Sequence, residues 1–272
     1  MQSRGMCICE YCHADRGNWY PCKYVRTAQA SAELTVKQMK MIRKLKTYKH
    51  ALWFLLYSAF YMTAFSAVEK AGHVHYHVIH TWLDEQIPFC RFFIIPYFLW
   101  FGFIGAAVTW FIMCCKNRDE YYKLITMLMM GMTIFIVVSV VYPNRLDLRP
   151  AQVEGNDIFA ILCRYLYRTD TPTNVLPSIH VYNSMAVCYA VNANETLRKK
   201  KWVMAGTDVL TLLIVLSTMF LKQHSVIDVT TGMVMSVVLQ VICDHIFETE
   251  PERAGADARI YSSKQGESGS RA

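Results

Sequence analysis

Residues 124–143, LITMLMMGMTIFIVVSVVYP, contain no charged side chain and decide the fold class of this chain. A helix needs roughly 20 apolar residues to cross a hydrocarbon core of about 30 Å, and this stretch meets that length. Comparable apolar stretches occupy residues 51–68, 92–115, 202–221 and 225–243, and a shorter, more polar one occupies residues 178–193. We therefore expect an all-α polytopic membrane protein with six transmembrane helices in a bundle.

The basic residues alternate along the chain with these predicted helices. Residues 1–50, 115–123, 194–202 and 248–272 contain 10, 3, 4 and 4 Lys and Arg, whereas residues 69–91 and 143–177 contain 2 and 4. Cytoplasmic loops of membrane proteins carry an excess of Lys and Arg. The pattern predicts that both termini are cytoplasmic, and it explains the net charge of +7 without a nucleic-acid partner.

The same pattern predicts three segments. Residues 1–49 form a basic cytoplasmic N-terminal segment, residues 50–247 the six-helix membrane domain, and residues 248–272 a disordered cytoplasmic tail. The tail is rich in Gly, Ser and charged residues, which cannot bury enough apolar surface to fold. The N-terminal segment contains a group of cysteines whose spacing is not that of a zinc knuckle, so a reduced tail is expected, with a metal site as the alternative.

The first predicted outer loop is rich in histidine. On a helix His73, His77 and His80 would share one face. This pattern predicts an interfacial histidine-rich face, with a transition-metal site as the alternative.

Three polar clusters are expected at the same membrane face, although the chain separates them by tens of residues. They are Arg149-Pro150, Pro177-Ser178-Ile179-His180, and Lys222-Gln223-His224 followed by Asp228. Their convergence at one face, which follows from the helix topology, predicts a single site.

Each cluster offers a group that phosphoryl transfer needs. A carboxylate at Asp228 can fix the orientation of the His224 imidazole and make its other ring nitrogen a better nucleophile. His180 can protonate a leaving oxygen near neutral pH. The helix that Pro177 opens offers backbone N–H groups to an anion. Arg149 and Lys222 add positive charge where a phosphoryl group develops negative charge.

These residues resemble the type-2 phosphatidic acid phosphatase family of lipid phosphate phosphatases. The family carries K-x6-R-P, P-S-x-H and S-R-x5-H-x3-D, and this chain has Arg149-Pro150, Pro177-Ser178-Ile179-His180 and Ser217-x6-His224-x3-Asp228 in the same order. The resemblance covers residues 50–247. It implies that His224 is the nucleophile, Asp228 its orienting partner and His180 the general acid, and that Arg149, Ser178 and Lys222 hold the phosphate.

The chain departs from the family pattern at two cations. Tyr142 and Thr218 occupy the positions of the first-motif lysine and the third-motif arginine. Lys222, one helical turn after Thr218, and Arg145, three residues after Tyr142, are the candidates to replace them. Asn174 upstream of the P-S-[small apolar]-H motif is similar to the branch that contains inositol phosphorylceramide synthase, in which an alcohol accepts the transferred group.

The expected function is therefore a plasma-membrane lipid phosphatase that hydrolyses a lipid phosphomonoester or pyrophosphate at the non-cytoplasmic face through a phosphohistidine. Its partners are a lipid phosphate substrate and membrane lipids, and we expect neither a metal nor another cofactor. One alternative is a head-group phosphotransferase with an alcohol acceptor. Another is a non-catalytic membrane scaffold or transporter. The sequence does not predict an oligomeric state.

Overall fold

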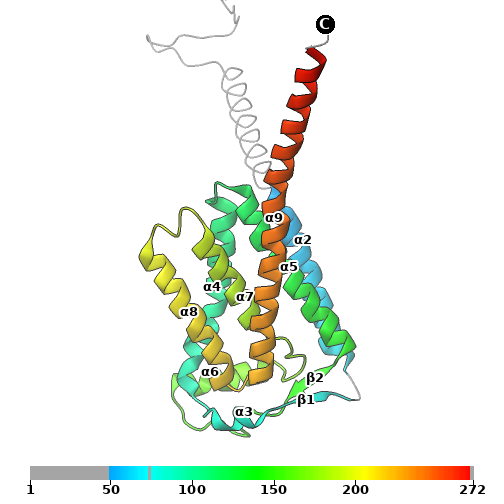
Figure 1. Ribbon diagram of the computed structural model, residues 1–272. Helices are drawn as coiled ribbons and strands as arrows, with labels where there is room; N and C mark the ends of the chain where they lie inside the picture. Colours follow the sequence, from blue (N-terminus) through cyan, green and yellow to red (C-terminus); the bar gives the residue numbers. More distant parts are fainter. Residues whose placement is uncertain (1–48, 73–74, 270–272) are drawn as a thin grey trace, which may run out of the picture. The chain divides into compact units, whose positions relative to one another are not determined.

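The structure, a computed structural model, describes residues 49–72 and 75–269 (Figure 1). The chain divides into two units, Met1–Trp53 and Phe54–Ala272. Only residues 49–53 of the first unit are described, so the predicted N-terminal segment and its cysteines lie outside the described residues. The second unit contains the helices and loops that build the site.

Five helices of the described chain are long and apolar enough to cross a membrane. They are α2 (Lys49–Ala71), α4 (Ile94–Met113), α5 (Arg118–Val141), α8 (Lys201–Phe220) and the first part of α9 (Val226–Gly269). These helices confirm the five long apolar stretches of the sequence. Helix α9 is traced through residues 248–269, where the sequence predicts a disordered tail.

The predicted sixth span is not confirmed. Residues 178–193 contribute helix α7 (Ile179–Ala193), whose 15 residues extend only about 22 Å, less than the hydrocarbon core. Helix α7 packs against α4, α5, α8 and α9 and is buried among them. Because its neighbours rather than lipid cover it, α7 tolerates the polar residues that set it apart in the sequence.

Close packing fixes α7 against α5. The Tyr182 ring lies over Gly131, where an added Cβ would come within 1.9 Å of the ring. The Tyr182 hydroxyl donates to the Met127 carbonyl at 2.5 Å. Glycine at position 131 therefore makes room for the aromatic ring at the centre of the helices.

Short elements gather at one end of the helices, the end that Figure 1 shows at the bottom. Strands β1 (His77–Ile79) and β2 (Asn144–Leu146) pair in parallel, and helices α3 (Trp82–Gln86) and α6 (Ile158–Thr169) lie in the adjoining loops. The all-α prediction is thus corrected to a mostly helical fold with one small sheet. The predicted helical histidine face is also wrong for His77, which lies in a strand and stacks on Tyr142.

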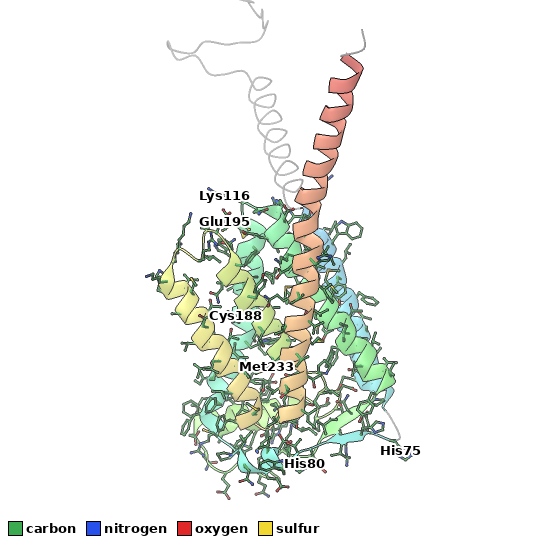
Figure 2. The ribbon with its side chains drawn as sticks, viewed as in Figure 1. His75, His80, Lys116, Cys188, Glu195 and Met233 are labelled. Carbon is green, nitrogen blue, oxygen red and sulfur yellow. The ribbon has the colours of Figure 1, made fainter. Side chains whose placement is uncertain are left out.

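Figure 2 shows the two ends of the helices by their labelled side chains. His75 and His80 lie at the end that carries the short elements, and Lys116 and Glu195 lie at the other. Helices α7 and α9 both begin at the His80 end, so the N-termini of these two helices meet there.

Candidate functional site

Ser178 begins helix α7 and joins it to α9. Its side chain caps the helix by accepting the Val181 amide at 3.4 Å, and its own amide donates to the Asp228 carbonyl at 3.1 Å. Ser178 is fully buried. The residue that the sequence assigned to phosphate binding thus holds the start of α7 against the start of α9.

The approach of the two helices depends on Gly232, one turn after Asp228. An added Cβ at Gly232 would lie 2.7 Å from the Ser178 carbonyl oxygen, closer than a side chain can come. The absence of a side chain at Gly232 therefore allows Ser178 to bond the Asp228 backbone.

The contact between the starts of α7 and α9 brings the imidazole rings of His180 and His224 together in an edge-to-face arrangement. His180 Nδ1 lies 3.3 Å from His224 Nε2, and the ring planes are inclined by 60°. Trp100 and Tyr97 of α4 pack around the His180 ring, with centroids 4.5 and 4.9 Å away. Aromatic rings thus fix the position of His180, while its Nδ1 faces the second histidine.

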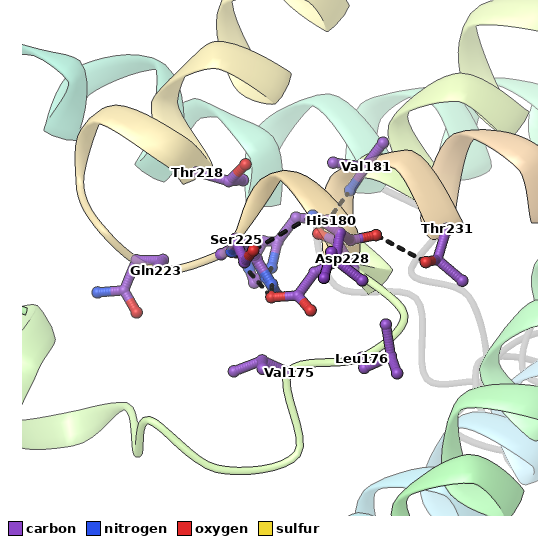
Figure 3. A network of polar contacts seen from close by, with 12 residues as sticks. Val175, Leu176, His180, Val181, Thr218, Gln223, Ser225, Asp228 and Thr231 are labelled. Atoms are coloured by element: carbon purple, nitrogen blue, oxygen red, sulfur yellow. Dashed lines mark hydrogen bonds and ion pairs between the residues drawn. The ribbon is translucent and has the colours of Figure 1, made fainter. Parts of the chain in front are cut away.

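The other nitrogen of His224 faces a carboxylate. His224 Nδ1 lies 3.5 Å from Asp228 Oδ2, an ion-pair distance without hydrogen-bond alignment. Asp228 is fully buried, and its Oδ2 accepts the Ser225 amide at 2.9 Å (Figure 3). His224 therefore lies between Asp228 on one side and His180 on the other.

A loop of five residues between α8 and α9 carries His224, and α3 holds this loop. Asp84 of α3 is buried, and its carboxylate accepts the Ser225 hydroxyl at 2.6 Å and the Val226 amide at 2.8 Å. Burial alone would raise the pKa of Asp84, but these bonds and those from Thr81 hold it below its ordinary value. Asp84 therefore remains an ionised clamp on the loop.

Lys222 completes this clamp from the loop side. Its backbone is left-handed, with φ at 54°, and its ammonium group donates to the carbonyls of Asp84, at 2.6 Å, and Ile87. Burial lowers the pKa of Lys222, and the nearby Asp84 carboxylate opposes this effect. The side chain is therefore occupied in holding α3 and does not line the cavity that the histidines line.

Arg149 contacts Gln223, the residue before His224. Its guanidinium donates to the Asp170 carbonyl at 2.7 Å and to Gln223 Oε1 at 2.5 Å, and it lies over the Tyr167 ring. The Asp170 carboxylate is 3.8 Å away. Burial raises the pKa of Asp170, and the Arg149 charge opposes this rise. Arg149 therefore reaches the site through Gln223, whose carbonyl oxygen it holds.

A cavity of about 190 Å³ opens beside the two histidines. One part of its wall is apolar, from Tyr61, Met62, Phe65, Trp100, Phe135, Val175 and Ile179. The other part is polar, from Asp170, Thr171, Thr173, Asn174, His180, Gln223 and His224. An apolar wall that ends at a few polar groups suits a molecule with a hydrocarbon part and a polar head.

The structure brings together three of the predicted site residues, His180, His224 and Asp228, and places Arg149 next to them. It does not bring Arg145 or Lys222 to the cavity wall. The exposed Arg145 side chain lies in β2 and pairs weakly with Asp147 at 3.9 Å. In the described residues, no group of three or more His, Cys, Asp or Glu is placed to hold a metal ion.

The sequence analysis assigned no role to two buried polar residues of the site, Gln223 and Asp84. Gln223 is 98% buried and lines the cavity, and its Nε2 has no partner among the described residues. Its position between Lys222 and His224, two residues assigned to the site, could have indicated that Gln223 also belongs to the site. Asp84 carried no signal, because the chain separates it from Ser225 by 141 residues.

The glycine at position 232 gives a first prediction. Gly232→Ala should push Ser178 away and separate His180 from His224, with a loss of about 1–3 kcal/mol of stability, as for an overpacked core. Turnover should fall together with stability. Thermal unfolding and initial rates of the purified protein measure both effects.

The matched control is Gly206→Ala in α8, where an added Cβ meets nothing within 4 Å. This substitution should be neutral, or stabilising by about 0.5–1 kcal/mol. Equal effects of the two substitutions would contradict the role of Gly232.

The region that contains the site matches a known protein family. Residues 148–251 match the family model described as the PAP2 superfamily. This region includes Arg149, the start of α7, His224 and Asp228, and it confirms the resemblance to type-2 phosphatidic acid phosphatases. No curated protein and no solved structure gave a match.

Proposed function

We propose that this protein is a membrane enzyme that cleaves a phosphoric ester of a lipid through a phosphohistidine. The chain contains a region that matches the PAP2 superfamily, whose members are phosphatases or related phosphotransferases. The observation that carries the proposal is the array of Asp228, His224 and His180. The Asp228 carboxylate contacts the His224 imidazole, and the other nitrogen of His224 contacts the His180 imidazole. All three belong to the family region.

His224 supplies the nucleophile. Because Asp228 Oδ2 lies 3.5 Å from the Nδ1 of His224, the proposed tautomer carries its proton on Nδ1 and its lone pair on Nε2, the nitrogen that lies next to the cavity-lining His180. Attack by Nε2 on phosphorus leaves a positive charge on the ring, which the Asp228 carboxylate stabilises. The buried position of Asp228 strengthens this interaction because little water screens it.

His180 supplies the proton for the leaving oxygen and afterwards accepts one from water. A phosphorus atom about 3–3.5 Å from the nucleophile, with a leaving oxygen beyond it, does not fit within the 3.3 Å between the two rings. The rings must therefore separate when substrate binds. This separation requires a shift of the His224 loop against its hydrogen bonds or of the His180 ring against its aromatic contacts.

The phosphate oxygens need donors. The amide of Gln223 is held through its oxygen by Arg149, which leaves its Nε2 free to donate within the cavity wall. Arg149 stabilises the negative charge from behind this amide. In this arrangement Lys222 and Ser178 act on the loop and the helix start, and Arg145 remains at the surface.

The substrate reaches the site from the membrane. Met62 and Phe65 lie on α2, one of the candidate spans, and Met62 is 59% exposed, so the apolar cavity wall continues to the lipid-facing surface. The charge distribution of the loops supports a non-cytoplasmic location for this end of the helices, and the plasma membrane is the proposed membrane. A lipid of the outer leaflet is therefore the proposed substrate.

A head-group phosphotransferase is the second candidate, because the same histidines serve an alcohol acceptor as well as water. Asp170, a carboxylate that lines the cavity, can accept a hydrogen bond from such an alcohol. The arrangement of His180, His224 and Asp228 argues against a non-catalytic scaffold, because a scaffold does not require these three side chains to contact one another.

Trapping of the intermediate tests the proposal. Brief incubation with a ³²P-labelled lipid phosphate should label the protein, and the label should be stable in alkali and lost in acid, as a phosphoramidate is. Vanadate should block both labelling and turnover, and EDTA should leave them intact because the proposed steps use no metal. A label that persists in the His224→Ala variant, or activity that EDTA removes and a divalent ion restores, would contradict the mechanism.

A further inference from the structure

Helix α2 lies along the cavity with an apolar face that ends in a carboxylate. Tyr61, Met62 and Phe65 line the cavity, and Glu69 follows Phe65 by one helical turn on the same face. Glu69 lies outside the region that matches the family model. A lipid beside α2 would therefore have its chains against the aromatic part and its head group near Glu69.

Glu69 holds three residues of the polar cavity wall through hydrogen bonds. Its carboxylate accepts hydrogen bonds from the Thr171 hydroxyl, from the Thr173 hydroxyl at 3.3 Å and from Asn174 Nδ2 at 2.8 Å. All three donors line the cavity. The Thr173 hydroxyl also lies 3.4 Å from the second carboxylate oxygen, so both oxygens of Glu69 are engaged with residues of the cavity wall.

Asn174 provides an independent observation. It is 97% buried, and its Oδ1 has no hydrogen-bond partner in the described part of the chain. Its backbone is left-handed, with φ at 53°, a conformation that costs energy and that surrounding contacts must maintain. A buried acceptor without a partner, on a residue that lines the cavity, is able to accept a hydrogen bond from a ligand donor.

The charges of this wall fit a donor and oppose a phosphate. Asp170 lines the cavity and pairs with Arg149, and Glu69 adds a second carboxylate that bonds three of the lining residues. Ionised phosphate oxygens accept hydrogen bonds but cannot donate them. The negative charge of Glu69 would also repel a doubly charged phosphomonoester. A hydroxyl or a primary ammonium group, in contrast, donates to carboxylate and amide oxygens.

We propose that the cavity wall formed by Thr171, Thr173 and Asn174, whose side chains bond the Glu69 carboxylate, is a head-group subsite, and that the substrate is a phosphodiester lipid whose head group donates O–H or N–H hydrogen bonds. This inference rests on the proposed function and names its substrate class. His224 Nε2 bonds to phosphorus while the bond from phosphorus to the glyceride oxygen breaks, and His180 gives that oxygen its proton. The head group stays on phosphorus. Water then adds hydroxide to phosphorus and a proton to His180, which releases the phosphorylated head group and His224.

The test compares lipids with identical acyl chains in vesicles that contain the full-length protein. Phosphatidylethanolamine offers N–H donors, phosphatidylglycerol offers O–H donors, phosphatidylcholine offers a cation without N–H donors, and phosphatidic acid has no head group. Release of diacylglycerol is measured for each. We expect at least one donor head group to exceed phosphatidylcholine by about tenfold, the effect of a hydrogen bond to a charged group. The relative rates of the first two lipids show which donor the subsite takes.

Glu69→Gln should change the rates in opposite directions. Loss of the charged acceptor should lower kcat/KM for the preferred donor lipid by about tenfold. Loss of the repelling charge should raise kcat/KM for phosphatidic acid by about two- to fivefold. Asn174→Gly, which keeps the left-handed backbone, should lower the rate for the donor lipid more than for phosphatidylcholine. Glu154→Gln, a carboxylate outside the cavity, is the matched control.

Equal losses on all lipids in Glu69→Gln would mean that Glu69 has only a structural role and would overturn the subsite. Equal rates on phosphatidylcholine and both donor lipids would overturn it as well. Turnover of an aryl phosphate that depends on His224, without turnover of any diester lipid, would refute the subsite and leave the proposed function standing. If no substrate showed turnover dependent on His224, the proposed function itself would fail.

Discussion

His224→Ala is expected to abolish turnover of every phosphate ester, with kcat reduced by roughly 10⁴-fold, the loss seen when a catalytic triad is disrupted. In the proposed mechanism His224 forms the bond to phosphorus. Among the described residues, no other nucleophile lies between Asp228 and His180 to replace it. Steady-state rates with a lipid phosphate and with an aryl phosphate ester measure this effect. The purified variant must elute and unfold like the unsubstituted protein.

His180→Ala separates the two histidines by their chemistry. A general acid matters less when the leaving group departs without protonation. The variant should therefore lose roughly 10²–10⁴-fold on the lipid but retain measurable activity on an aryl phosphate with an acidic phenol. Asp228→Asn should give an intermediate result, because it removes the orienting charge and keeps the nucleophile. If His224→Ala kept the aryl phosphatase activity and His180→Ala lost it, the two roles would be reversed.

Asp84→Ala is expected to have the second large effect, although Asp84 is not proposed to touch the substrate. The substitution leaves the Ser225 hydroxyl and the Val226 amide without their acceptor, at a cost of about 2–4 kcal/mol for two buried donors. The loop that carries His224 should shift, so kcat should fall more than KM rises. Denaturant unfolding and steady-state kinetics of the same preparation measure the two effects.

The clamp also predicts a dependence on pH. Because the pKa of Asp84 is lower in the folded protein than its ordinary value, the ionised carboxylate stabilises the fold above about pH 4. This contribution is lost as the pH falls through the folded pKa. Asp84→Asn should therefore remove the part of the acid-induced loss of stability that Asp84 causes. An unchanged acid profile in this variant would show that Asp84 does not hold the loop as an anion.

Lys222→Met offers a comparison with the sequence-based assignment. If Lys222 bound phosphate, this variant would be stable and inactive. Since the ammonium group bonds the carbonyls of Asp84 and Ile87, stability and activity should instead fall together, as they do in Asp84→Ala.

The sequence alone determined the five long apolar helices and the three residues of the proposed catalytic triplet. Hydrophobicity is a property of each segment, so the length of an apolar run sufficed to predict five helices. His180, His224 and Asp228 followed from short motifs, because a helix start and a short loop place their residues locally. The sequence did not determine whether α7 spans the membrane, since a buried helix and a short span have similar compositions.

Only the tertiary structure decided the roles of the residues around that triplet. Helical spacing from Thr218 placed Lys222 on the face of the histidine, but α8 ends at Phe220 and the left-handed backbone at Lys222 directs its side chain to α3. Glu69 and Asp84 reach the site from segments more than 100 residues away along the chain. Hydrogen bonds between distant segments depend on how the helices pack, and no local pattern in the sequence encodes them.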